Sequence, residues 1–170
     1  MKTKNSVLIL IFILVISSAY SQEKSRKQIK EEQKLEKQKL VEDMLVSKQF
    51  VFKAKSAMSA GAGSVNLINS TYNIAFQLDF IKSYLPFYGT GYNGLGPGGD
   101  TGFKFKGKPE SFTVQKGKKN YIVDAEVKAD NDVYRISLSV NPGGNANLSI
   151  SSNHRSSISF SGEIIATDPQ

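Results

Sequence analysis

Hydrophobic and polar positions alternate along most of the chain after residue 49. Apolar residues recur at every second position in short runs, which is the spacing of a β-strand with one buried face. The runs with this pattern cover residues 50–52, 72–80, 103–105, 112–114, 121–127, 134–140, 146–150 and 158–164. We therefore predict eight or nine short strands, with residues 72–80 forming one continuous strand.

Turn-forming residues separate these runs. Gly, Asn, Asp, Pro and Ser gather at residues 116–118, 130–132, 141–145 and 152–155. Strands joined by tight turns predict an antiparallel meander. Because the strands have one apolar face and no second helical layer follows, the sheet must close on itself or stack on another sheet. We expect a mainly β fold, an antiparallel β-barrel over residues 49–166, with a β-sandwich as the alternative.

A charged helix is predicted before the strands, over residues 22–48. This segment contains no Pro or Gly and is dense in Glu, Lys and Gln, which favour helices. Its apolar residues crowd toward the C-terminal end, at Leu40, Val41, Met44, Leu45 and Val46. We expect the helix to be solvated at its start and to dock through its last two turns. A partner-binding or coiled-coil segment is the alternative, although no sustained heptad supports it.

The first 21 residues have the pattern of a secretory signal peptide. Lys2 and Lys4 precede an unbroken apolar run over residues 7–16, and small residues follow at Ala19 and Ser21. Cleavage is expected between Ser21 and Gln22. A membrane anchor is the alternative, but a spanning helix needs about 20 apolar residues. We expect an exported protein, periplasmic or secreted, with no membrane span after cleavage.

Composition narrows the possible chemistry. The 170 residues include 22 Lys and Arg against 15 Asp and Glu, one histidine and no cysteine. The absence of cysteine excludes disulfides, thiolate metal sites, a cysteine nucleophile and a lipid anchor on cysteine. The positive charge is spread thinly along the chain, so we expect no nucleic-acid partner. No cofactor and no metal site are expected.

The segment over residues 84–102 is rich in glycine and aromatic residues. Gly89, Gly91 and Gly94 match G-x-G-x-x-G, but Pro97 prevents the helix that a dinucleotide site requires. We interpret the segment as a long loop at the barrel mouth, where small barrels bind ligands. The predicted ligand-binding wall or lid residues are Tyr84, Phe87, Tyr88 and Tyr92. The alternative is that these rings plug one end of the barrel.

Two carboxylates, Asp124 and Glu126, lie two residues apart on one predicted strand. Paired carboxylates can serve as acid and base in glycoside hydrolysis. Lys128 shares their face, however, so a solvated strand face is the favoured interpretation.

The remaining candidate chemistry lies in turns. Asp130 and Asp132 bracket a predicted turn, where Asp side chains commonly bond to the local backbone. His154 lies in another polar turn and lacks a second histidine for metal binding. We expect no catalytic residues, with a carboxylate-based hydrolase as the weakest alternative.

The order of several short motifs is similar to that of a known family. They are residues 50–54 (FVFKA), 67–74 (LINSTYNI), 85–89 (LPFYG), 102–105 (GFKF), 134–138 (YRISL) and 153–162 (NHRSSISFSG). Over roughly residues 25–165 the chain resembles the DUF4251 family (domain of unknown function 4251) of exported Bacteroidetes proteins. The resemblance implies a lipocalin-like β-barrel and supplies no activity, cofactor or catalytic residue. The family commonly has a basic residue after the glycine equivalent to Gly89, where this chain has Thr90.

Three functional hypotheses follow from the sequence. The first is an exported, non-enzymatic barrel that binds an apolar or amphipathic small molecule at its mouth. The second is an envelope-associated module that holds a protein partner through the N-terminal helix and the sheet edge. The third is the hydrolase. A disordered tail is expected at residues 167–170.

Overall fold

The alternating segments form one ten-stranded antiparallel sheet in the part of the chain that the structure describes. The structure is a computed structural model that describes residues 2–59, 63–88 and 102–167, with side chains from residue 25 onward except that of Ser59. Residues 89–101 of the predicted loop, which include Tyr92, lie outside the described residues, as do residues 168–170 of the predicted tail. Residues 1–37 form one unit of the chain and residues 38–170 the other.

One helix precedes the strands, α1 (Lys2–Ser47). The strands are β1 (Phe50–Ser59), β2 (Gly63–Asn66), β3 (Asn73–Phe76), β4 (Ile81–Leu85), β5 (Phe103–Gly107), β6 (Pro109–Lys116), β7 (Tyr121–Ala129), β8 (Asp132–Val140), β9 (Asn145–Ser152) and β10 (Ile158–Ala166). Within the described residues no helix is long and apolar enough to cross a membrane.

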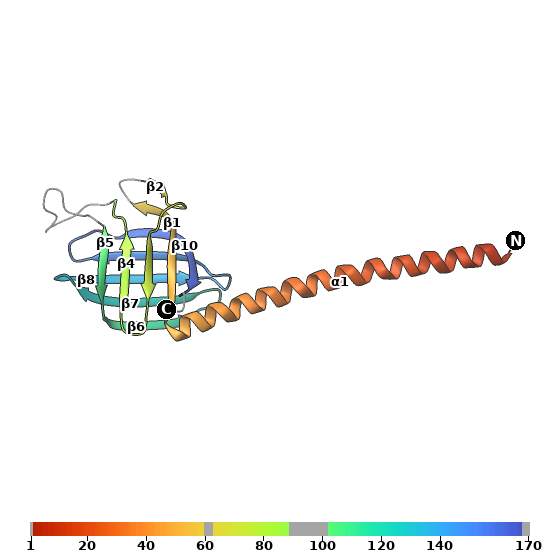
Figure 1. Cartoon of the computed structure of the whole chain (residues 1–170), viewed down its shortest axis with the longest axis horizontal. Helices are drawn as coiled ribbons and strands as arrows, with labels where there is room; N and C mark the ends of the chain where they lie inside the picture. Colours follow the sequence, from red (N-terminus) through yellow and green to blue (C-terminus); the bar gives the residue numbers. More distant parts are fainter. Residues whose placement is uncertain (1, 60–62, 89–101, 168–170) are drawn as a thin grey trace. The chain divides into compact units, whose positions relative to one another are not determined.

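The sheet runs in the order β5-β4-β3-β1-β10-β9-β8-β7-β6, and β2 pairs separately with β1. Two meanders, β3 to β5 and β6 to β10, are joined where β1 lies between β3 and β10. Figure 1 shows β1 and β4 running across the direction of β7 and β8, so that the sheet curls around its own apolar face. This nearly closed antiparallel barrel confirms the predicted fold class.

The core lies inside this barrel. On β7 and β8 every second residue is buried, so the period-two pattern of the sequence directly marks the interior face. Large side chains fill the interior, and the rings of Phe50 and Phe76 stack with centroids 4.5 Å apart. The largest fully buried residues are Phe50, Phe52, Phe76, Phe103, Phe160, Leu45, Ile74, Ile81, Leu85, Leu138, Leu148 and Ile150.

The last turns of α1 belong to the same core. Val41 and Leu45 are buried, whereas Leu40 and Val46 are exposed, because residues four apart share a helix face. The helix ends at Ser47, and the next residue, Lys48, has a φ of 55°, the left-handed conformation that terminates helices. The docking of the last two turns thus agrees with the prediction from the sequence.

The structure corrects two of the strand predictions. Residues 72–80 do not form one strand, because Gln77 N donates to the Phe80 carbonyl over 2.9 Å in a tight turn that separates β3 from β4. Leu78, predicted to face the core, is exposed in that turn. Val114 is also exposed, because β6 is the last strand of the sheet and only part of its inner face is covered. The described residues therefore contain ten strands instead of eight or nine.

Candidate functional site

The four aromatic residues predicted to bind a ligand have different environments. Tyr84 lies on the outer face of β4 with 40% of its surface exposed, whereas Phe87 points into the core with 8% exposed. Tyr88 is half-buried. Tyr92 lies outside the described residues. The structure thus separates one inward ring from two rings that reach the surface.

The alternation of β4 explains why Tyr84 faces outward. Ile81, Ser83 and Leu85 are buried, and the residues between them are exposed. The buried Ser83 hydroxyl donates to the Phe103 carbonyl over 2.7 Å, so the inward position of a polar residue is satisfied. Beyond the strand, Phe87 packs edge-on against Phe103 with centroids 5.3 Å apart.

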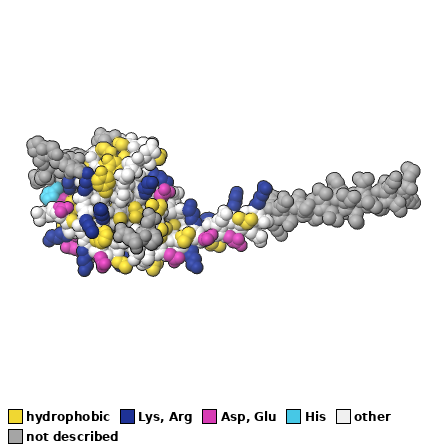
Figure 2. All heavy atoms as spheres, viewed as in Figure 1, with side chains coloured by type: hydrophobic (Ala, Val, Ile, Leu, Met, Phe, Trp, Pro, Cys, Tyr) yellow, Lys and Arg dark blue, Asp and Glu magenta, His cyan; other side chains and the backbone are white. Residues whose placement is uncertain are grey.

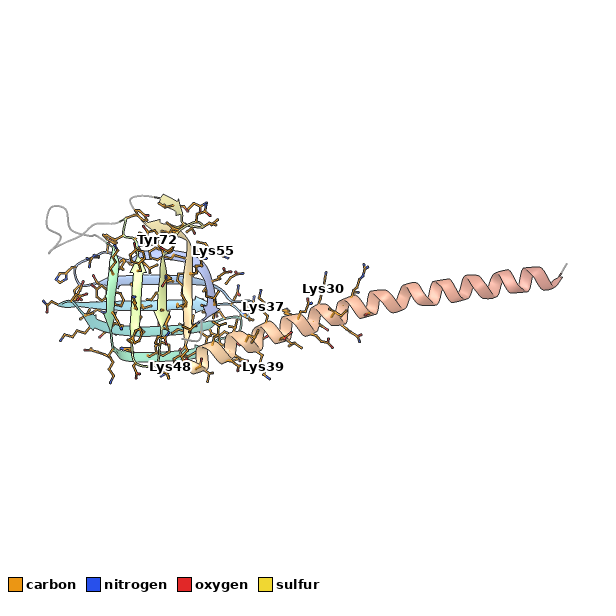
Figure 3. The ribbon with its side chains drawn as sticks, viewed as in Figure 1. Lys30, Lys37, Lys39, Lys48, Lys55 and Tyr72 are labelled. Atoms are coloured by element: carbon orange, nitrogen blue, oxygen red, sulfur yellow. The ribbon has the colours of Figure 1, made fainter. Side chains whose placement is uncertain are left out.

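Three tyrosines form a surface cluster beside this end of the barrel, which we call the tyrosine patch (Tyr72, Tyr84 and Tyr88). The rings of Tyr72 and Tyr84 lie 5.5 Å apart at 32°. They are neighbours because Asn73, the residue after Tyr72, pairs with Tyr84 across β3 and β4. Figure 3 shows Tyr72 at the start of β3, and Figure 2 shows hydrophobic side chains gathered in this region. Tyr72 was not among the residues predicted from the sequence.

A lysine completes the patch. The Lys104 ammonium lies 4.7 Å from the centroid of the Tyr84 ring, because the two residues face each other across β4 and β5. Burial raises the pKa of the Tyr88 hydroxyl, and the nearby Tyr72 raises it further. The patch therefore combines phenol rings with the ammonium of Lys104, a combination that suits an apolar group with an anionic end.

A second cluster lies where β8 begins and β9 ends. Asp132 is buried, and its Oδ1 accepts hydrogen bonds from Val133 N at 2.8 Å and Asn153 N at 3.0 Å. Its Oδ2 lies 3.3 Å from His154 Nδ1 and 3.5 Å from an Arg155 nitrogen. The carboxylate thus ties the β9–β10 turn to the first residue of β8.

The charge on Asp132 is stabilised by its surroundings. Burial alone would raise the pKa of the carboxyl, but hydrogen bonds from Ser152, Val133 and Asn153, with the nearby His154, outweigh it and lower the pKa. Turn chemistry predicted local backbone bonding for this aspartate but not its burial. Asp132 shares the alternation of Tyr134 and Ile136 on β8, which places it on the inner face, and the β9–β10 turn supplies its distant partners.

Arg155 connects this cluster to the aromatic core. Its side chain is 13% exposed and its guanidinium lies 5.8 Å from the centroid of the Phe103 ring. Phe103 also contacts Tyr134 edge-on, and Tyr134 stacks on Phe105 at 4.0 Å. These contacts fill the described part of the barrel at this end, so the aromatic side chains there pack against one another.

Asp124 and Glu126 lie on the outer face of β7. They line an open hollow of about 310 Å³ together with Arg135 and short serine side chains. Glu126 pairs with Arg135 at 3.4 Å, while Asp124 is exposed. Among the described residues, no group of three or more acidic or histidine side chains is arranged to hold a metal ion.

Comparison with known proteins yields a family and a structural relative. The model of the family DUF4251, described as a domain of unknown function, matches residues 31–164. The crystal structure of a DUF4251 family protein from Bacteroides eggerthii DSM 20697, at 1.95 Å resolution, is similar with a TM-score of 0.60. The two chains are 17% identical, and the match covers 76% of this chain and 87% of the other. At this identity the likeness establishes a common fold. None of the curated proteins matches the chain significantly.

Proposed function

This chain belongs to the DUF4251 family, and we propose that it is an exported, non-enzymatic β-barrel protein that binds an amphipathic small molecule at the tyrosine patch. The observation that carries this proposal is the partial exposure of the neighbouring rings of Tyr72 and Tyr84 beside Lys104. Tyrosine rings that remain partly exposed supply a rigid apolar surface whose hydroxyl groups can form hydrogen bonds. Such a surface binds the apolar part of a ligand without requiring an internal cavity.

The lysine indicates the ligand's polar end. Lys104 is held over the Tyr84 ring, so its ammonium lies at the border of the apolar surface. An anionic head group placed there would gain a charge-assisted hydrogen bond while its apolar tail covers the rings. We therefore expect an acidic amphiphile, such as a fatty acid or an anionic lipid fragment.

The packing of aromatic side chains in the described part of the barrel supports binding at the surface of the mouth. Phe103, Phe105 and Tyr134 occupy the interior below this end and contact one another. A ligand that entered the barrel would have to displace them, whereas the tyrosine patch is accessible as it stands.

Export is part of the same proposal. The apolar run over residues 7–16 with Ser21 and Gln22 behind it supports cleavage and release into the periplasm or beyond. Native mass spectrometry of protein purified from its own cell envelope tests both halves. The mass should correspond to a chain beginning at Gln22, and an acidic amphiphile should accompany it. An uncleaved chain overturns the export proposal alone, and a cleaved chain without a ligand overturns the binding proposal.

A dye measurement assigns the binding to the patch. The probe is 1-anilinonaphthalene-8-sulfonate, an anionic amphiphile that fluoresces on apolar surfaces. We expect Tyr84→Ala and Lys104→Ala each to weaken its binding about tenfold, which corresponds to about 1.4 kcal/mol.

The opposite end of the same hairpin supplies the matched control. There Lys106 lies 4.1 Å from the centroid of the Phe80 ring, a similar pair away from the patch. Phe80→Ala and Lys106→Ala should leave the dye affinity unchanged. Equal losses at both ends would show that the dye binds nonspecifically and would contradict the assignment.

An interaction module in the cell envelope is the second candidate function. The exposed apolar side chains of Leu40 and Val46 on α1, together with an edge strand of the sheet, favour it. It predicts that a protein, instead of a small molecule, accompanies the chain in the same mass-spectrometric experiment.

A further inference from the structure

Strand β6 leaves one of its edges without a neighbouring strand. It pairs with β7 on one side and is the last strand in the order of the sheet. The described residues show no backbone hydrogen bond from its other edge to another segment. The N–H and C=O groups of β6 that point away from β7 form a template on which a further strand can pair, although Pro109, the first residue of the strand, has no N–H to donate.

The inner face of β6 is also incompletely covered. Phe112 faces Ala125 of β7 and contacts Phe76 edge-on with centroids 6.1 Å apart, yet it is only half-buried. Val114 faces Val123 on the same side and remains 36% exposed. An added strand would cover both side chains.

We propose that β6 pairs with β6 of a second copy of this chain, as two antiparallel strands related by a two-fold axis. This pairing is independent of ligand binding at the tyrosine patch. In such a pair one residue lies opposite itself, and residues equally far on either side of it lie opposite each other. The centre of the pairing therefore fixes every other contact.

When Thr113 is the central residue, the residues that face each other in the two copies are chemically complementary. Glu110 then lies opposite Lys116, Phe112 opposite Val114, and Ser111 opposite Gln115. The two-fold axis repeats each of these pairs. Opposite charges then meet at both ends of the paired segment, at Lys116 and at Glu110, the residue where the register between β6 and β7 shifts. Apolar side chains meet in the middle of the inner face, and polar side chains meet on the outer face.

The neighbouring centres are less favourable. A centre at Phe112 places Lys108 opposite Lys116, which brings like charges together. A centre at Val114 places Phe112 opposite Lys116. Charge complementarity therefore selects the register centred at Thr113 and a second copy as the occupant.

The charged ends of β6 are compatible with this arrangement. Lys116 already forms an ion pair with Glu42 on α1, which holds the ammonium at the edge of the barrel. Glu110 is exposed at the other end of the strand. In the dimer each Lys116 would lie between Glu42 of its own chain and Glu110 of the second copy.

Single cysteines test the register, because the natural chain contains none. Opposed residues of an antiparallel pair have Cα atoms roughly 4.5–5.5 Å apart, within the range that a disulfide spans. Protein made from the full-length coding sequence is oxidised with glutathione disulfide. We expect Thr113→Cys to form a covalent dimer by itself. Ser111→Cys and Gln115→Cys should each form no covalent dimer alone and should cross-link to each other when mixed.

These outcomes decide between the register and chance collision. Equal cross-linking of all three single variants would show random encounter and would overturn the proposal. A monomeric Thr113→Cys variant would overturn it as well.

Charge reversal tests the same pairing without cysteine. Dimer dissociation is measured by sedimentation over a concentration series. Glu110→Lys and Lys116→Glu should each weaken the dimer at least tenfold, and the double variant should restore it. Glu42→Gln, which removes only the pair within one chain, should leave the dimer essentially intact. An unaltered protein that is monomeric throughout the series refutes the proposal, and so does a double variant no better than the single ones.

Discussion

At the scale of single residues, the buried carboxylate of Asp132 is the clearest case of a side chain whose charge contributes to stability. We expect Asp132→Asn to lower the free energy of unfolding by about 1–3 kcal/mol at pH 7, because the amide keeps the shape but leaves Arg155 without its anionic partner. Urea unfolding measures the loss.

The lowered pKa of Asp132 fixes how this loss depends on pH. A carboxyl whose pKa is lower in the folded state stabilises the fold fully above its unfolded value, near 3.8, and loses that contribution as pH falls through the folded value. The difference between natural protein and variant should therefore be constant above about pH 5 and shrink at lower pH. Asp130→Asn, in the exposed turn next to it, is the control and should change stability by less than about 0.5 kcal/mol. A difference that persists unchanged at pH 2 would contradict the assignment.

Two residues of the tyrosine patch show which part of the site could be predicted from the sequence and which could not. The alternation Ile81, Ser83, Leu85 places Tyr84 outward once β4 is known, so its surface position could be predicted from its neighbours. Tyr72 joins the patch through pairing between β3 and β4, and that pairing depends on the turn at residues 77–80. Asp79 is the only turn-forming residue of this turn, and the apolar alternation continues through Leu78 and Phe80, so the pattern favoured one long strand.

At the scale of elements, the last two turns of α1 act as part of the barrel core. Leu45 is 1% exposed and Val46, its neighbour in the chain, is 78% exposed. We expect Leu45→Ala to destabilise the barrel by about 2–5 kcal/mol, since it leaves a cavity in a packed core. Val46→Ala, measured by the same urea unfolding, should change stability by less than about 0.5 kcal/mol. Similar values for the two variants would mean that the helix end does not contribute to the core.

Elements were predicted well where the apolar pattern is local. The long alternations of β7 and β8 appear in the structure with their buried faces as expected. Val114 of β6 was predicted to be buried but is exposed. The reason is that β6 is an edge strand, with β7 on one side and no strand of the described residues on the other. The alternation of apolar and polar residues does not show whether a strand has a neighbour on both sides.

At the scale of the whole molecule, the two meanders are joined by the pairing of β1 with β10, the first and last strands of the sheet in the chain. The register between them shifts at residues 54–56 of β1, opposite Gly162 of β10. Bulges and glycines allow a sheet to bend sharply at such positions. A closure between distant segments was expected from the need to bury the apolar face, but the sequence did not indicate which strands would meet.

Gly162 is the residue on which that bend depends most directly. A Cβ atom at this position would overlap the backbone carbonyl oxygen of Lys53, and it would also press on the Phe52 ring at 3.0 Å. Because a backbone atom cannot move aside as a side chain can, we expect Gly162→Ala to force β1 and β10 apart and to destabilise the barrel by about 1–3 kcal/mol or more. Gly143→Ala is the matched control, since its Cβ would meet only the Asn141 side chain at 3.3 Å. Thermal unfolding followed by circular dichroism should show a clear drop in Tm for Gly162→Ala and little change for Gly143→Ala. If the two variants melt alike, the close approach of β1 and β10 is not what holds the two meanders together.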